Sequence, residues 1–121
     1  MNANRKQAHL NEEIRQKLGL LLIKEASDPR FKAVTITSVK VAKDLSTARV
    51  TFSCYLPDTD IEALTDSLNR AAGFFGHGLG RTFSARKTPR LKFYYDRGFD
   101  YAQEIETKLK EVRYSDDQEN P

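Results

Sequence analysis

The sequence predicts an α+β domain of two layers, in which helices cover one face of a small sheet. Three observations support this class. Apolar residues recur every three or four positions in three stretches, β-branched and apolar residues alternate in others, and the order is helix, strand, strand, kinked helix, strand, helix. At 121 residues, 39% hydrophobic and 31% charged, the chain fits a single globular domain, which we expect to span residues 1–113.

The first helix is predicted over residues 4–26 by one apolar stripe. Ser27-Asp28-Pro29 marks its end, because the residue before a proline avoids helical geometry. The stripe comprises Leu10, Ile14, Leu18, Leu21 and Leu22.

Two strands follow and form a predicted hairpin. Residues 33–42 are rich in β-branched side chains, with a change of parity that suggests a bulge near Ser38, and residues 48–56 alternate cleanly. The alternation places Ala48, Val50 and Phe52 on a buried face.

A kinked helix, or two short ones, is predicted from Asp60 to Gly80. Thr59 and Glu62 have the spacing of a capping box, and Gly80 is a plausible C-terminal stop. Ala71-Ala72-Gly73 interrupts the pattern, since a glycine inside a helix costs roughly 1 kcal/mol relative to alanine.

The last two elements are a strand over residues 90–96 and a helix over residues 100–113. In the strand, Leu91, Phe93 and Tyr95 share one face. The helix carries a stripe of Tyr101, Ile105, Leu109 and Val112. Residues 114–121 form an acidic tail without apolar pattern, which we expect to be disordered.

Positive charge gathers in one segment although the net charge is only +3. Residues 81–97 hold six basic residues and one acidic residue. Such a segment can neutralise phosphates, and Tyr94 could stack on a base. The alternative is a solvated basic rim around a packed core. The candidate side chains are Arg81, Arg86, Lys87, Arg90 and Lys92, with Arg5, Lys6 and Arg15 of the first helix as supporting contacts.

A nucleotide site, a metal site and a membrane span have little support in the sequence. The glycines between residues 73 and 80 lie in a helical pattern, not in the strand-to-helix context of a phosphate loop, so a kink or close packing explains them better. Cys54 lies on the apolar parity of a strand, and His9 and His77 have no metal-site spacing, so no cofactor is expected. No stretch is apolar enough for a membrane span or signal peptide, so we expect a cytoplasmic protein.

Several motifs resemble the ribosome-binding factor A family over residues 4–112. They occur in the family's order and are EASDPR (25–30), VTIT (34–37), DLSTA (44–48), NRAAGF (69–74), LGR (79–81) and PRLKFYYD (89–96). The resemblance implies a type II KH-like fold with an Ala-x-Gly kink, here Ala71, Ala72 and Gly73, in place of a Gly-x-x-Gly loop. The chain departs from the family at Gly76 and Gly78, which suggests a short or frayed third helix, and at Arg90, where glutamate is common.

The resemblance further implies a non-enzymatic assembly factor. Such a factor binds the small (30S) ribosomal subunit and its 16S rRNA, promotes maturation of the 16S rRNA 5′ end, and supports growth in the cold. We expect a monomer that binds free subunits rather than translating ribosomes. We do not expect it to bind DNA or membranes. Recognition should depend on RNA shape and phosphates more than on base sequence.

Two other functional classes are also compatible with the sequence. The domain could be a protein-interaction module that docks through the outer sheet face or the last helix without touching RNA. It could also be a thiol-dependent enzyme using Cys54, which a functional Cys54→Ala variant would eliminate.

Overall fold

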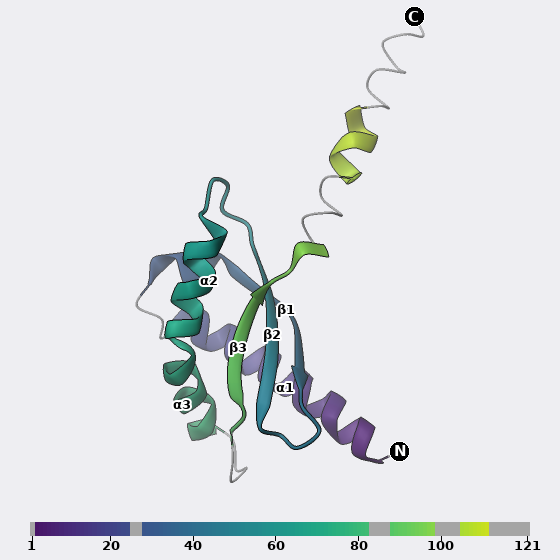
Figure 1. Ribbon diagram of the computed structural model, residues 1–121, viewed down its shortest axis with the longest axis vertical. Coiled ribbons are helices and arrows are strands. Elements are labelled where there is room, and N and C mark those ends of the chain that lie inside the picture. The colour runs from purple at the N-terminus through teal and green to yellow at the C-terminus, as the bar shows by residue number, and fades with distance from the viewer. Residues whose placement is uncertain (1, 25–27, 83–87, 99–104, 112–121) are drawn as a thin grey trace, which may run out of the picture.

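The computed structural model describes residues 2–24, 28–82, 88–98 and 105–111, and it confirms the predicted α+β class (Figure 1). The labelled elements, in chain order, are α1 (Asn2–Lys24), the 3₁₀ helix η1 (Pro29–Ala33), β1 (Val34–Val41), β2 (Thr47–Cys54), α2 (Ile61–Arg70), α3 (Ala72–Thr82) and β3 (Arg90–Tyr95). Residues 105–111 form a further helical segment without a label.

The three strands form one sheet in the order β1-β2-β3. β1 and β2 pair antiparallel as the predicted hairpin, and the register shift between Ile36 and Ser38 confirms the bulge. β3 pairs parallel with β2, so the chain must cross from one end of the sheet to the other between them. α2 and α3 make this crossing and lie beside β3 (Figure 1).

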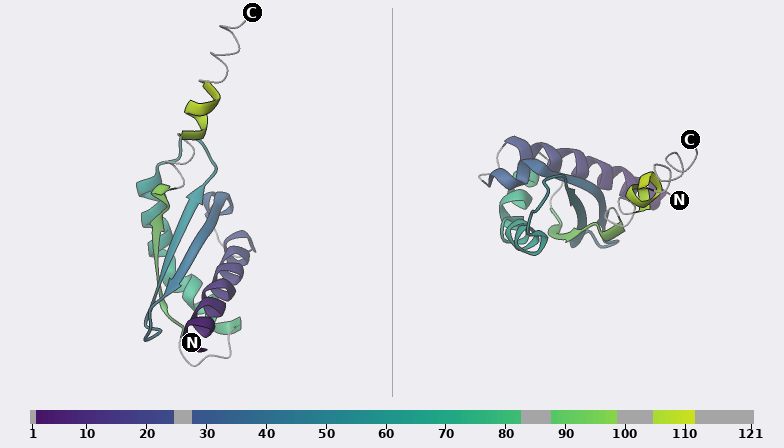
Figure 2. Two further views of the ribbon diagram at one scale, coloured as in Figure 1. Left: turned by 90° about the vertical axis from the view of Figure 1, so that its right-hand side faces the viewer. Right: turned by 90° about the horizontal axis from the view of Figure 1, so that it is seen from above.

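The core lies between the sheet and the helices. α1 runs along one side of the sheet and contacts β1 and α3, as the end-on view in Figure 2 shows. The alternation predicted for the strands is confirmed over most of their length, because the inward positions are buried while Arg49, Arg90 and Lys92 are exposed. It fails at the end of β2, where Ser53 is buried and Leu56 is exposed beyond the strand. The largest fully buried side chains are Phe52, Phe75, Phe93, Ile14, Leu18, Leu22, Leu64, Leu68, Leu79 and Val50.

Two predicted helix ends are wrong. Asp60, not Thr59, caps α2, because its carboxylate accepts a hydrogen bond from the Ala63 backbone N–H at 3.1 Å. The Thr59 hydroxyl instead donates to the Leu56 carbonyl. Gly80 does not end α3, which continues to Thr82 despite its glycines. The suggestion of a short third helix is therefore also wrong.

η1 was missed because its pattern is only five residues long. Asp28 caps it by accepting from the Arg30 N–H, and Pro29 occupies the first turn, where its missing N–H costs nothing. The Arg30 guanidinium also pairs with the Asp28 carboxylate and donates to the Ser67 hydroxyl at 2.8 Å. This cluster ties η1 to α2.

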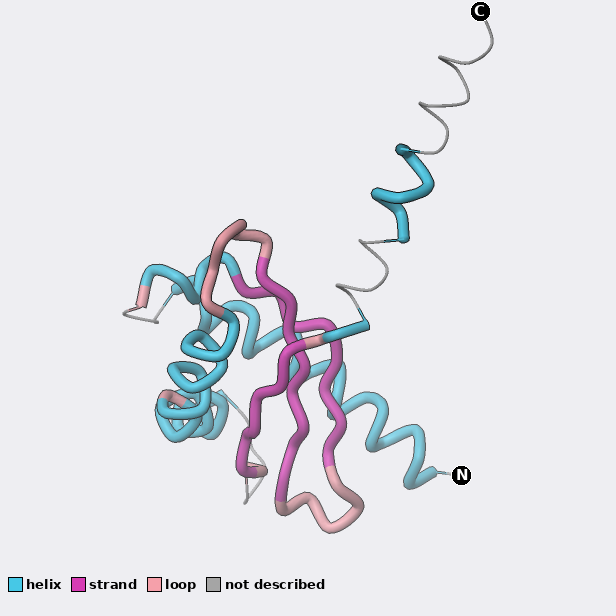
Figure 3. The backbone as a smooth tube through the Cα atoms, turned by 45° about the horizontal axis from the view of Figure 1, so that its top comes forward, coloured by secondary structure: helices cyan, strands magenta, loops and turns pink. Residues whose placement is uncertain are grey.

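The two described residues of the apolar stripe predicted for the last helix are not buried. Ile105 and Leu109 are 42% and 52% exposed, and every described residue from 105 to 111 is exposed. Tyr101, Val112 and the acidic tail lie outside the described residues. In Figure 3 the helical segment 105–111 stands apart from the three strands, so it supplies none of the sheet's cover.

Candidate nucleic-acid interface

The helix break between α2 and α3 is held against β3 by one side chain. Ala71 caps the C-terminal end of α2 with φ −86° and ψ 0°, and its N–H still donates to the Ser67 carbonyl at 3.0 Å. Two residues earlier, the Asn69 side chain bonds both backbone polar groups of Phe93 in β3. The break predicted at Ala71-Ala72-Gly73 therefore lies beside the edge strand.

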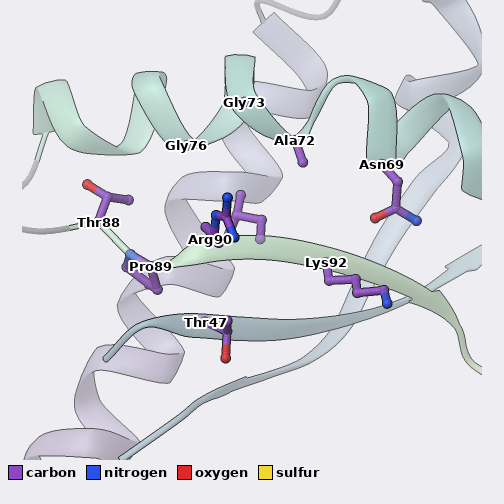
Figure 4. Close-up of a pocket in the computed structure, with 10 residues that line it drawn as sticks. Thr47, Asn69, Ala72, Gly73, Gly76, Thr88, Pro89, Arg90 and Lys92 are labelled. Carbon is purple, nitrogen blue, oxygen red and sulfur yellow. The ribbon is translucent and has the colours of Figure 1, made fainter. Parts of the chain in front are cut away.

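A groove of about 600 Å³ opens between α3 and β3 at this break. Figure 4 shows α3 and its break forming one wall, and Thr88, Pro89 and the β3 residues forming the facing wall. The lining residues are Thr47, Asn69, Ala72, Gly73, Gly76, Thr88, Pro89, Arg90, Leu91 and Lys92.

The helical wall of the groove is bare because two of its residues are glycine. A Cβ placed on Gly73 or Gly76 would meet no atom within 4 Å, so packing within the domain does not require either glycine. Close packing does explain Gly78, whose added Cβ would lie 3.1 Å from a Leu21 methyl carbon. The bare wall lets a ligand approach the α3 backbone closely.

The strand wall supplies the positive charge. Arg90 and Lys92 are exposed on β3 and line the groove, while Leu91 and Phe93 between and beyond them point into the core. A phosphate-bearing ligand in this groove would meet two cations on one side and an uncharged helical surface on the other.

The other candidate cations that the structure describes do not line the groove. Arg81 is exposed on the last turn of α3, and Arg86 and Lys87 lie outside the described residues. Arg5 and Lys6 are exposed near the start of α1. That part of α1 lies at the opposite edge of the sheet, because the neighbouring Gln7 and Asn11 side chains bond the backbone of Val41 in β1.

Arg15 already has an anionic partner. Its guanidinium donates two hydrogen bonds to the Glu12 carboxylate, one of them 2.9 Å from Nε to Oε2. These bonds lower the pKa of Glu12 and raise the pKa of Arg15. A phosphate at this position would have to compete with Glu12.

Sequence reasoning missed two cations on the open face of the sheet, Lys40 and Arg49. Both are exposed, and the Arg49 guanidinium lies over the Tyr94 ring at 4.1 Å from its centroid. Strand alternation placed Arg49 on the outer face, but only the strand order shows that β2 is central and brings Arg49 next to β3. The ring face of Tyr94 that was expected to stack on a base thus carries Arg49.

The structure offers little for the other chemistries. Among the described residues, no three His, Cys, Asp or Glu side chains gather as a metal site would need, and no helix has the length and apolarity to cross a membrane. Cys54 is half-buried, packs against the core, and lies 4.0 Å from the Thr59 hydroxyl. That setting is typical of a structural thiol.

Three features together define a type II KH-like domain: an antiparallel hairpin, a broken helix that follows it, and a third strand that pairs parallel with the hairpin. A family model described as ribosome-binding factor A matches residues 6–109. A ribosome-binding factor A of Geobacter sp. is 39% identical over 110 residues, which cover 91% of this chain and 92% of that protein. The chain therefore belongs to the ribosome-binding factor A family.

Solved structures of the family share the fold. The crystal structure of ribosome-binding factor A from Thermus thermophilus aligns with a TM-score of 0.65 and 28% identity, covering 75% of this chain and 97% of that one. A homology model of the Thermus thermophilus protein, fitted into a cryo-EM map of a complex with the 30S subunit, aligns with a TM-score of 0.62 and 28% identity, covering 75% and 96%.

Proposed function

We propose that this protein is an assembly factor that binds the 30S ribosomal subunit and contacts its 16S rRNA. The observation that carries the proposal is the groove at the helix break, whose strand wall bears Arg90 and Lys92 and whose helical wall is left bare by Gly73 and Gly76. Support also comes from the Thermus thermophilus relative, which has been fitted into a map of a complex with the 30S subunit.

Binding in the groove would depend on the RNA backbone more than on base identity. A sugar-phosphate backbone can come close to α3 at the two glycines, while the cations of β3 neutralise its phosphates. Neither Arg90 nor Lys92 forms an ion pair with a carboxylate in the part of the chain that the structure describes. Arg81, exposed on the last turn of α3, would extend the positive surface beyond the groove. The proposal also includes Arg86 and Lys87, which lie outside the described residues.

Binding at this site would promote processing of the 16S rRNA 5′ end and late maturation of the subunit, including in the cold. The factor would act in the cytoplasm as a monomer, on free subunits rather than translating ribosomes. It would act by stabilising one conformation of the rRNA, so no bond is made or broken by the protein and no cofactor is needed.

Gene replacement tests this function. In a bacterium lacking its own family member, the wild-type chain should restore growth in the cold and lower the ratio of precursor to mature 16S 5′ ends. An Arg90→Gln/Lys92→Gln variant should restore neither, whereas a Lys24→Gln/Lys32→Gln variant, with the same charge change at exposed sites elsewhere, should restore both. Unchanged precursor levels with abundant, folded wild-type protein would contradict the proposed role.

A protein-interaction module remains the second candidate, and one observation favours it. Ile105 and Leu109 are exposed four residues apart on one helical segment, which is the spacing of a helix that docks into a partner's groove. If an Ile105→Ser/Leu109→Ser variant lost subunit binding while Arg90→Gln/Lys92→Gln retained it, this candidate would replace the RNA-directed one.

A further inference from the structure

The open face of the sheet, opposite the core, carries a row of three cations. Lys40 of β1 pairs with Arg49 of β2, and Arg49 pairs with Lys92 of β3. All three residues are exposed. Since neighbouring strands lie about 5 Å apart, the backbones of these three basic residues fall within roughly 10 Å of one another across the sheet.

This row is unfavourable for the free domain. Like charges directly opposite each other on neighbouring strands repel, and here the repulsion occurs twice in one row. No carboxylate among the described residues forms an ion pair with Lys40, Arg49 or Lys92. An arrangement of this kind favours an external anion with several charges in sequence.

Tyr94 fixes the central cation of the row. The Arg49 guanidinium lies 4.1 Å and the Lys92 ammonium 5.5 Å from the centroid of its ring. Attraction to the ring limits the freedom of both long side chains before any ligand binds, which lowers the entropic cost of binding. Tyr94 therefore acts as a positioning residue for Arg49.

The surfaces on the two sides of the row differ in charge. Beside Tyr94, Arg49 and Arg97 line a hollow of about 730 Å³ together with three acidic residues of α2 and its cap, Asp60, Glu62 and Asp66. In the other direction Thr47 pairs with Arg90, which leads into the groove beside α3. A polyanion lying on the row thus meets carboxylates on the side of Tyr94 and a further cation, Arg90 at the groove, on the other side.

We propose that the open sheet face, along Lys40, Arg49 and Lys92, is a second phosphate-binding surface for the RNA whose backbone enters the groove. This inference rests on the proposed function. Charge complementarity and continuity with the groove favour an RNA backbone over an acidic protein segment, because Lys92 belongs to both surfaces.

The test is a fluorescence-anisotropy titration of the labelled full chain with purified 30S subunits and with naked 16S rRNA across a salt series. Lys40→Gln/Arg49→Gln removes two charges outside the groove, and Lys24→Gln/Lys32→Gln is the matched control. We expect the first variant to bind both ligands about tenfold more weakly and to reduce the slope of log affinity against log salt by about 1.5, while the control matches wild type. Tyr94→Leu should weaken binding and Tyr94→Phe should not.

The outcomes separate this inference from the function it rests on. Wild-type protein that binds neither ligand would remove the proposed function itself. Wild-type binding with Lys40→Gln/Arg49→Gln equal to the control would overturn only the second surface. A loss confined to intact subunits, with naked rRNA bound normally, would mean that the row meets a ribosomal protein and would overturn the RNA assignment.

Discussion

The side-chain amide of Asn69 pairs with the backbone of Phe93 as a neighbouring strand would. Its Oδ1 accepts from the Phe93 N–H at 2.8 Å, and its Nδ2 donates to the Phe93 carbonyl at 3.1 Å. β3 is an edge strand, so these groups have no partner strand on that side. One asparagine thus protects the sheet edge and fixes the position of the helix break.

Asn69→Ala should lower the free energy of unfolding by about 1–3 kcal/mol, because it leaves two half-buried backbone groups without partners. Thermal or urea unfolding measures the loss. Gln16→Ala is the control, since that amide makes only an exposed bond to Glu12. If Asn69→Ala unfolded like the control, the two bonds would not hold the break in place.

Two adjacent phenylalanines should respond very differently to truncation. Phe75 is fully buried and its ring packs against Phe31 and Phe93 at centroid distances of 5.8 and 6.0 Å, whereas Phe74 is 47% exposed. We expect Phe75→Ala to cost about 3–5 kcal/mol and Phe74→Ala less than about 1 kcal/mol in urea unfolding. Equal losses would contradict the described orientation of α3.

Gly76→Ala should stabilise the protein and weaken its binding. Alanine is favoured over glycine inside a helix by about 0.5–1 kcal/mol, and the new methyl would meet nothing in the domain. It would project at the groove, however, where the proposed RNA backbone approaches. Gly78→Ala is the matched comparison and should gain less stability, because its methyl would press on Leu21. Melting temperature and 30S affinity, measured together, separate the two effects.

The Asp28–Arg30 pair should make stability depend on acid pH. Side-chain hydrogen bonds from Arg30 lower the pKa of Asp28 from its ordinary 3.8 in the folded state. The stabilisation is therefore present above pH 3.8 and is lost as the pH falls through the lower folded pKa. Melting temperatures between pH 7 and about pH 2 should fall more steeply for wild type than for Asp28→Asn. Curves for wild type and Asp28→Asn that run parallel would contradict the coupling.

The sequence was sufficient for the elements whose pattern is long and local. The stripe from Ile14 to Leu22 and the alternation of Leu91 and Phe93 each follow from a single burial direction, so they predict a helix and a strand well. Helix ends were less predictable, because Asp60 and Thr59 are both good caps and only the backbone path decides between them.

The site could not be predicted from the sequence, because it is formed by contacts between parts of the chain that are far apart in the sequence. The groove needs Gly76 to face Arg90 across α3 and β3, and the row on the open face needs β2 to lie between β1 and β3. The two glycines of the groove also looked like packing glycines, and only their surroundings show that Gly73 and Gly76 face open space.

The most direct test of the central claim is co-sedimentation of the purified protein with free 30S subunits across a salt series. A variant with Arg81, Arg86, Lys87 and Arg90 changed to glutamine, shown by its melting curve to be folded, is measured beside wild type. We predict wild-type binding that weakens steeply as salt rises and a variant that stays in the supernatant. Wild-type protein that fails to sediment with mature or immature subunits, or binds with no dependence on salt, would contradict the RNA-directed account.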